Sequence, residues 1–180
     1  IDFTKFRRSP KWLIGYSDIT ALHSHIHNFG IETLHATMPV NFAKNKEAIA
    51  TLLKALMAEK LDYKVDTHLL NRNGIAEGEL AGGILSLLYA ITASASDIST
   101  KGKILFLEDL DEYLYHIDRM MLNLKRAGKL SNLAGLVVGG MSDMKDNTIP
   151  FGKNAEEIIL DAVKEYNYPV CFNFPAGHVD

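Results

Sequence analysis

The chain has 180 residues, of which 47% are hydrophobic and 23% are charged, a composition that excludes a disordered or low-complexity protein. The net charge is −3 and no basic cluster is larger than residues 5–11, so nucleic-acid binding is not expected. The longest uncharged run, residues 80–96, is shorter than the ~20 apolar residues that span a bilayer, and the single Cys171 fits a reducing compartment.

Short apolar runs alternate with amphipathic segments along the chain, which is the pattern of an α/β domain. The helix expected at 46–60 carries apolar residues at a helical period, and the helix expected at 17–29 stops at Gly30. In the first half, the sequence predicts strands at 12–15, 31–35 and 63–70 and helices at 17–29 and 46–60.

The second half continues the alternation and contains the clearest strand, an apolar run at 103–109 that ends in two carboxylates. Gly82-Gly83 is expected to lead into a helix that ends near Ala93, and residues 141–152 are expected to form a loop. Neither a repeat nor a flexible linker interrupts the chain, so we expect one domain. The remaining predictions are strands at 75–80, 133–138 and 169–174 and helices at 113–127 and 155–166.

Glu108 is the first candidate for chemistry, because functional groups gather at the carboxyl ends of strands in open α/β sheets. A carboxylate held by a stiff buried strand can orient a histidine and stabilise its cationic form, as in a catalytic triad. The sequence leaves a structural alternative open, in which Glu108 caps the following helix or pairs with Arg119.

His178 is the second candidate, because Pro175 and Gly177 predict a defined turn that would aim its imidazole. Histidine titrates near neutral pH and is the usual general base. The alternative is a solvated loop histidine. From spacing alone, the 70 residues between Glu108 and His178 do not say whether the two side chains meet.

Other polar clusters give weaker signals. Ser17 follows Gly15 as in a nucleophile elbow, but Ile19 replaces the second glycine, so a helix cap is favoured. Residues 23–27 contain three histidines without the H-E-x-x-H spacing; we interpret them as surface residues and expect no metal.

Gly82 and Gly83 could bring backbone N–H groups close to an anion or a carbonyl, which makes them candidate substrate-binding residues. Close packing of a strand against a helix would explain the pair equally well. The sequence contains no complete phosphate-binding loop, so a nucleotide-dependent enzyme is not expected and no cofactor is predicted.

Several segments together resemble the LD-carboxypeptidases, the serine peptidase family that includes the microcin-immunity peptidases. The resemblance covers nearly the whole chain, in the order found in the family. The segments that carry it are WLIGYSDITALH at 12–23, GGILSLL at 82–88, KILFLED at 103–109, IDRM at 117–120 and GH at 177–178.

This resemblance implies a two-domain enzyme without cofactor or metal. A flavodoxin-like N-terminal domain carries the nucleophilic serine, and a swivelling β/β/α-type C-terminal domain carries the glutamate and the histidine. By motif, Glu108 and His178 match those two triad members. We therefore interpret residues 1–180 as the C-terminal domain of a longer protein whose nucleophile is not in this chain, and expect the chain alone to be inactive.

The implied reaction is hydrolysis of the L-to-D amide that releases terminal D-Ala from murein tetrapeptide, during cytoplasmic peptidoglycan recycling. The implied partners are the murein-derived peptide, the N-terminal domain of the same protein and a second copy in a homodimer. Two departures from the family bear on specificity: Ile84 replaces an asparagine, and HATM at 35–38 replaces HGPM. A microcin-immunity-type peptidase and a non-catalytic peptide-binding module remain the alternatives.

Overall fold

The computed structural model describes residues 1–179, and its centre is a parallel sheet of four strands. The strand order β3-β4-β5-β6 follows the chain, so each crossover returns to the neighbouring position. The strands are β3 (Leu80–Ile84), β4 (Ile104–Leu110), β5 (Gly135–Ser142) and β6 (Val170–Cys171).

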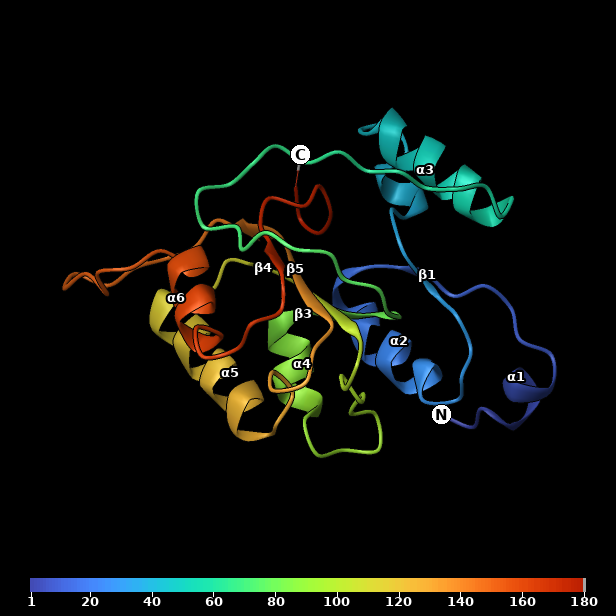
Figure 1. The fold of residues 1–180 in the computed structure, drawn as a ribbon. Coiled ribbons are helices and arrows are strands. Elements are labelled where there is room, and N and C mark those ends of the chain that lie inside the picture. The colour runs from blue at the N-terminus through green and yellow to red at the C-terminus, as the bar shows by residue number, and fades with distance from the viewer. Residues whose placement is uncertain (180) are drawn as a thin grey trace.

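The hydrophobic core lies between this sheet and three helices, which lie beside one another on one face (Figure 1). Leu105 and Leu107 of β4 point into this core, whereas Phe106 and Glu108 alternate to the opposite face. That alternation places Glu108 outside the helix-covered core. The three helices are α4 (Leu85–Ile91), α5 (Leu114–Arg126) and α6 (Ala155–Ala162).

Residues 14–35 form a smaller unit beside the edge strand β3 (Figure 1). Two short parallel strands, β1 and β2, pair Ile14 with Leu34 and Gly15 with His35. A 3₁₀ turn at Ser17–Ile19 leads into α2, and Thr20 of α2 accepts a hydrogen bond from the Ile84 amide at 3.2 Å. This unit comprises β1 (Ile14–Gly15), α2 (Thr20–His27) and β2 (Leu34–His35). Helix α1 (Thr4–Arg8) precedes it, and α3 (Lys46–Leu56) follows it and stands apart from it in Figure 1.

The α/β class predicted from the sequence is confirmed, but the segment at 63–70 is not a strand. It runs without regular structure, and its alternating pattern does not bury one face, because Leu69 is fully exposed. The strand expected at 75–80 forms instead at 80–84. Within residues 1–179, no helix is both long and apolar enough to cross a membrane.

Candidate functional site

Glu108 and His178 meet on the sheet face opposite the helices, although 70 residues separate them in the chain. The His178 Nδ1 lies 2.9 Å from Glu108 Oε2, and the His178 backbone N–H donates to the same oxygen at 3.3 Å. With Nδ1 protonated toward the carboxylate, Nε2 is the nitrogen free to accept a proton. The pair therefore has the geometry of a histidine oriented by a carboxylate.

The turn before His178 brings it close to Glu108. Gly177 has a φ of +100°, and a Cβ there would lie 2.7 Å from Glu108 Oε2, so this position requires glycine. Beyond the turn, the Ser142 hydroxyl at the end of β5 donates to the His178 carbonyl. The ends of β4 and β5 thus hold the loop from both sides.

Glu108 is fully buried, whereas the His178 side chain is 18% exposed. Among residues 1–179, Glu108 Oε1 has no hydrogen-bond donor, and its neighbour in register on β3 is the buried, apolar Ile84. A buried carboxylate is costly unless its charge is compensated. The hydrogen bond that Glu108 Oε2 accepts from His178 is therefore the polar contact that the structure gives this buried carboxylate, and it fixes the direction of the imidazole ring.

The smaller unit supplies two rings that the sequence did not single out, Tyr16 and His35. The Tyr16 ring centroid lies 5.0 Å from that of His178, and His35 lies 6.3 Å from Tyr16 and 5.2 Å from Phe106. Both residues lie in segments that the family resemblance named, WLIGYSDITALH at 12–23 and HATM at 35–38. Neither segment showed that its ring would lie beside His178 or Phe106.

Both ring nitrogens of His35 are buried, and neither has a hydrogen-bond partner among residues 1–179. Burial, followed by repulsion from His23 and His178, lowers the pKa of His35 from 6.5 to about 4. The imidazole is therefore neutral at pH 7. Because the unfolded chain binds the proton more readily, stability contributed by neutral His35 is lost as pH falls from 6.5 towards 4.

Replacement of His35 by leucine is expected to flatten this acid-dependent loss of stability. At pH 4.5 the wild-type chain carries a penalty of about 2.5 kcal/mol that His35→Leu lacks, whereas at pH 7 the penalty is close to zero. The free energy of unfolding in urea, measured for both proteins at pH 4.5 and 7.0, checks this difference.

His25→Leu is a suitable control, because His25 lies on α2 and has a hydrogen-bond partner in Ser96 at 3.0 Å. That variant shows how much of the change comes from replacing a histidine of the same unit by leucine rather than from the burial of His35. An unchanged pH dependence in His35→Leu would show that His35 is not held neutral by the fold.

Gly82 and Gly83 lie inside β3, which passes at Ile84 directly into α4, so the expected lead into a helix is confirmed and the strand extends over both glycines. Their φ values are +142° and +146°; a Cβ on Gly82 would lie 1.9 Å from the Phe106 carbonyl oxygen, and one on Gly83 would lie 2.5 Å from Thr20 Oγ1. Close backbone packing accounts for both glycines. Their role in substrate binding stays a prediction.

Asp109, the second carboxylate of the strand end, points to the other side of the sheet. It is buried and accepts hydrogen bonds from the amides of Ser86 at 2.8 Å and Leu110 at 2.9 Å. Burial raises the pKa of Asp109, and these hydrogen bonds oppose the rise. Asp109 therefore joins the end of β4 to the start of α4, while Glu108 faces the histidine.

The histidines of α2 were all expected at the surface, and for one of them this prediction is wrong. Within residues 1–179, no group of three or more histidine, cysteine, aspartate or glutamate side chains could hold a metal ion. His23 was expected at the surface, but it is buried and its two nitrogens bond Thr33 Oγ1 at 2.7 Å and the Gly15 carbonyl at 3.0 Å. Through these two hydrogen bonds His23 connects α2 to β1 and to the segment that precedes β2.

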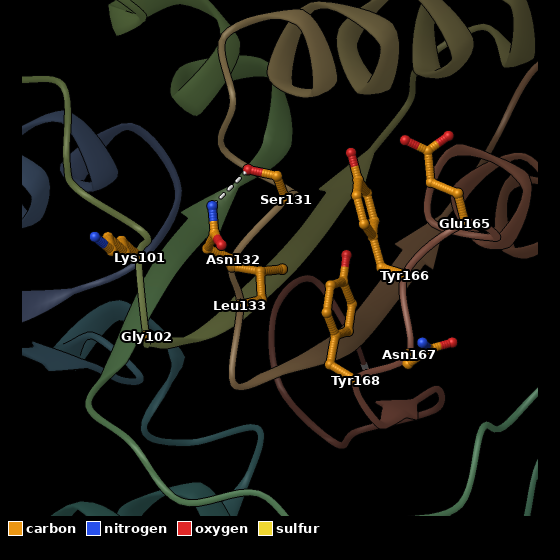
Figure 2. Close-up of a pocket in the computed structure, with 9 residues that line it drawn as sticks. All are labelled: Lys101, Gly102, Ser131, Asn132, Leu133, Glu165, Tyr166, Asn167 and Tyr168. Carbon is orange, nitrogen blue, oxygen red and sulfur yellow. Dashed lines mark hydrogen bonds between the residues drawn. The ribbon is translucent and has the colours of Figure 1, made fainter.

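An open hollow of about 590 Å³ lies at the opposite edge of the sheet (Figure 2). Its walls come from segments that precede β4, β5 and β6, whereas Glu108 lies near the carboxyl end of β4 and His178 follows β6. Figure 2 shows Tyr166 and Tyr168 side by side, and their rings stack on each other at 5.6 Å. The hollow is therefore separate from the Glu108–His178 pair.

A parallel α/β sheet with a carboxylate–histidine pair at its strand ends is an arrangement that hydrolases use. The family model described as the LD-carboxypeptidase C-terminal domain matches residues 77–180, which include both members of the pair. The chain belongs to the LD-carboxypeptidase family. The model of that family's N-terminal domain matches residues 1–36, a segment that the sequence interpretation placed in the C-terminal domain.

Relatives with curated descriptions agree with this family. The chain is 36% identical to a probable murein peptide carboxypeptidase of Bacillus subtilis, over 99% of the chain and 58% of the relative. It is 25% identical to the murein tetrapeptide carboxypeptidase of Pseudomonas aeruginosa, over 94% of the chain and 58% of that protein. The chain thus spans less than two thirds of the length of these relatives.

Solved structures show the same fold. A muramoyltetrapeptide carboxypeptidase from Oxalobacter formigenes matches with a TM-score of 0.87 and 25% identity, over 99% of this chain and 62% of that one. The microcin C7 self immunity protein MccF, in complex with glutamyl sulfamoyl guanosine, matches with a TM-score of 0.76 and 20% identity, over 97% of this chain and 62% of that one. The second likeness concerns the fold alone.

Proposed function

We propose that this chain is part of a serine-type LD-carboxypeptidase that releases terminal D-Ala from murein tetrapeptide. The observation that carries the proposal is the 2.9 Å contact between His178 Nδ1 and the buried Glu108 carboxylate. The substrate class is supported by the relatives described as murein peptide carboxypeptidases. We place the boundary between the two domains between residues 36 and 77.

In this proposal, His178 Nε2 takes the proton of a serine hydroxyl from a part of the protein outside this chain. The serine oxygen bonds to the carbonyl carbon of the L-residue, and His178 then gives its proton to the departing D-Ala nitrogen as the amide bond breaks. Water, deprotonated by the same nitrogen, then bonds to the acyl carbon; the ester bond to serine breaks, and His178 returns the proton to the serine oxygen. Glu108 holds the ring throughout and stabilises its positive charge each time the ring is protonated.

The setting of the enzyme is also a proposal. Cleavage of murein tetrapeptide suits cytoplasmic peptidoglycan recycling, and the protein would act as a homodimer. Glu108 and His178 belong to the C-terminal domain, so the N-terminal domain is the required partner. The reaction needs only proton transfer and a nucleophile, which a triad supplies by itself.

The test is D-Ala release from murein tetrapeptide by the complete reading frame, beside a His178→Ala variant. We expect that variant to lose about 10³-fold or more in kcat, because a triad loses most of its rate when one member is removed. The matched control is His116→Ala. His116 lies in α5, and its Nδ1 is 2.6 Å from the carboxylate of Glu112, which precedes that helix.

A second candidate function is that of a microcin-immunity-type peptidase, because the fold is similar to that of MccF. If the wild-type protein releases no D-Ala but cleaves an aminoacyl sulfamoyl nucleoside, that candidate replaces the first. If it cleaves neither substrate, the peptide-binding module of the same fold is the remaining interpretation.

A further inference from the structure

The His178 imidazole is held at Nδ1 by Glu108, but a single side-chain hydrogen bond leaves the ring free to tilt about that contact. Tyr16 provides a second contact, with ring centroids 5.0 Å apart and ring planes at 62°. This edge-to-face arrangement is a favourable one for aromatic rings. Two contacts in different directions restrict the tilt that one contact allows.

Tyr16 is itself fixed at both ends. Its backbone is extended at the end of β1, directly before Ser17, whose φ of +65° turns the chain into α2. At the other end of the side chain, the Asn41 amide donates to the Tyr16 hydroxyl oxygen at 2.6 Å. A ring anchored at backbone and hydroxyl can act as a rigid wall.

The contact also joins two parts of the protein. Tyr16 lies in the segment that matches the N-terminal-domain model, and His178 lies in the segment that matches the C-terminal-domain model. The Tyr16 ring of the first part therefore limits the orientation of the His178 ring of the second. Because a displacement of about 1 Å can lower a rate about 100-fold, such alignment matters for a general base.

We propose that Tyr16 is a positioning residue that, together with Glu108, holds the His178 ring so that Nε2 faces the nucleophile. The catalytic consequence rests on the proposed function, whereas the contact itself does not. Loss of the ring should lower kcat and leave KM nearly unchanged, because Tyr16 acts on the base rather than on the substrate.

The experiment compares Tyr16→Leu with Tyr16→Phe in the complete reading frame. Tyr16→Leu should lower kcat by about 10- to 100-fold. Tyr16→Phe keeps the ring and loses one hydrogen bond, so it should retain kcat within about threefold. Rescue by phenylalanine, with KM constant, separates positioning from a contact with the substrate.

A spectroscopic arm tests the contact without activity. Proton NMR should show a downfield Nδ1–H signal of His178, identified by its loss in His178→Gln. We expect the signal to persist in Tyr16→Phe and to be lost to solvent exchange in Tyr16→Leu. A nuclear Overhauser effect between the ring protons of Tyr16 and His178 is measured on the wild-type protein. It therefore does not depend on whether any variant folds.

The chain offers a matched control in a second tyrosine–histidine–glutamate group. Tyr89 contacts His116 edge to face at 6.0 Å, and His116 Nδ1 lies 2.6 Å from Glu112. Tyr89→Leu should leave kcat and the His178 signal unchanged.

The proposal is overturned if the wild-type protein lacks the Overhauser effect, or if Tyr16→Leu keeps both the His178 signal and kcat. If the wild-type protein has no activity on D-Ala substrates, the proposed function fails, and the two NMR measurements still decide whether Tyr16 holds the ring.

Discussion

In the complete protein, a Glu108→Gln variant is expected to remain folded and, under the proposed function, to lose about 10³- to 10⁴-fold in kcat for D-Ala release. Glutamine fills the same fully buried space but cannot stabilise the imidazolium, and its amide can present a donor to Nδ1. The ring would then hold the wrong tautomer. The measurement is kcat together with the midpoint of thermal unfolding, because only the first should change strongly.

Glu112→Gln is the matched control, since Glu112 makes the same Nδ1 contact with His116 outside the site. Its side chain is 25% exposed, so loss of that pair should cost little stability and no activity. Equal kcat values for Glu108→Gln and the wild-type protein would remove Glu108 from the mechanism and leave His178 to act alone.

The two members of the pair could be predicted from local patterns, but their contact could not. Glu108 was marked by its place at the end of a buried strand, and His178 by the turn before it. Their meeting depends on the ladder from β4 through β5 to β6 and on the hydrogen bond from Ser142 to the His178 carbonyl. Both are long-range features, which spacing along a sequence does not encode.

The residues around the pair were harder to predict because they come from a separate unit. Tyr16 directly follows β1 and His35 ends β2, and these strands of two residues each are too short for a periodic signal. His23 was predicted to be exposed, because three histidines within five residues, without the spacing of a metal site, are typical of a helix surface. Its burial follows from bonds to Thr33 and Gly15, which only the packed structure brings within reach.

The segment at 63–70 was mispredicted for a related reason. Alternation favours a strand only when a partner strand and a buried face are present. Here the chain runs along the surface and pairs only later, where Arg72 forms an antiparallel bridge with Val170. The periodic helices were predicted better, because amphipathic packing of α5 and α6 leaves a pattern in the local sequence.

A Gly82→Ala variant is expected to be strongly destabilised, because β3 and β4 approach each other closely at this glycine. A Cβ there would lie 1.9 Å from the Phe106 carbonyl oxygen, and alanine tolerates a φ of +142° poorly. Strain and overpacking together should lower the free energy of unfolding by about 3–5 kcal/mol, a large part of the stability of an ordinary domain. Urea unfolding of the variant measures this loss.

Gly102→Ala separates steric overlap from backbone conformation. Gly102 also has a positive φ, +71°, but a Cβ there meets nothing within 4 Å in the described part of the chain. Its replacement by alanine should lower the free energy of unfolding by about 1 kcal/mol.

Because Phe106 lies two residues before Glu108 on β4, Gly82→Ala should also displace the Glu108 carboxylate, and the variant protein that still folds should show a lowered kcat. Equal stability losses in the two variants would mean that β3 and β4 can separate at Gly82 without strain, and that the rigid strand end is not what fixes Glu108.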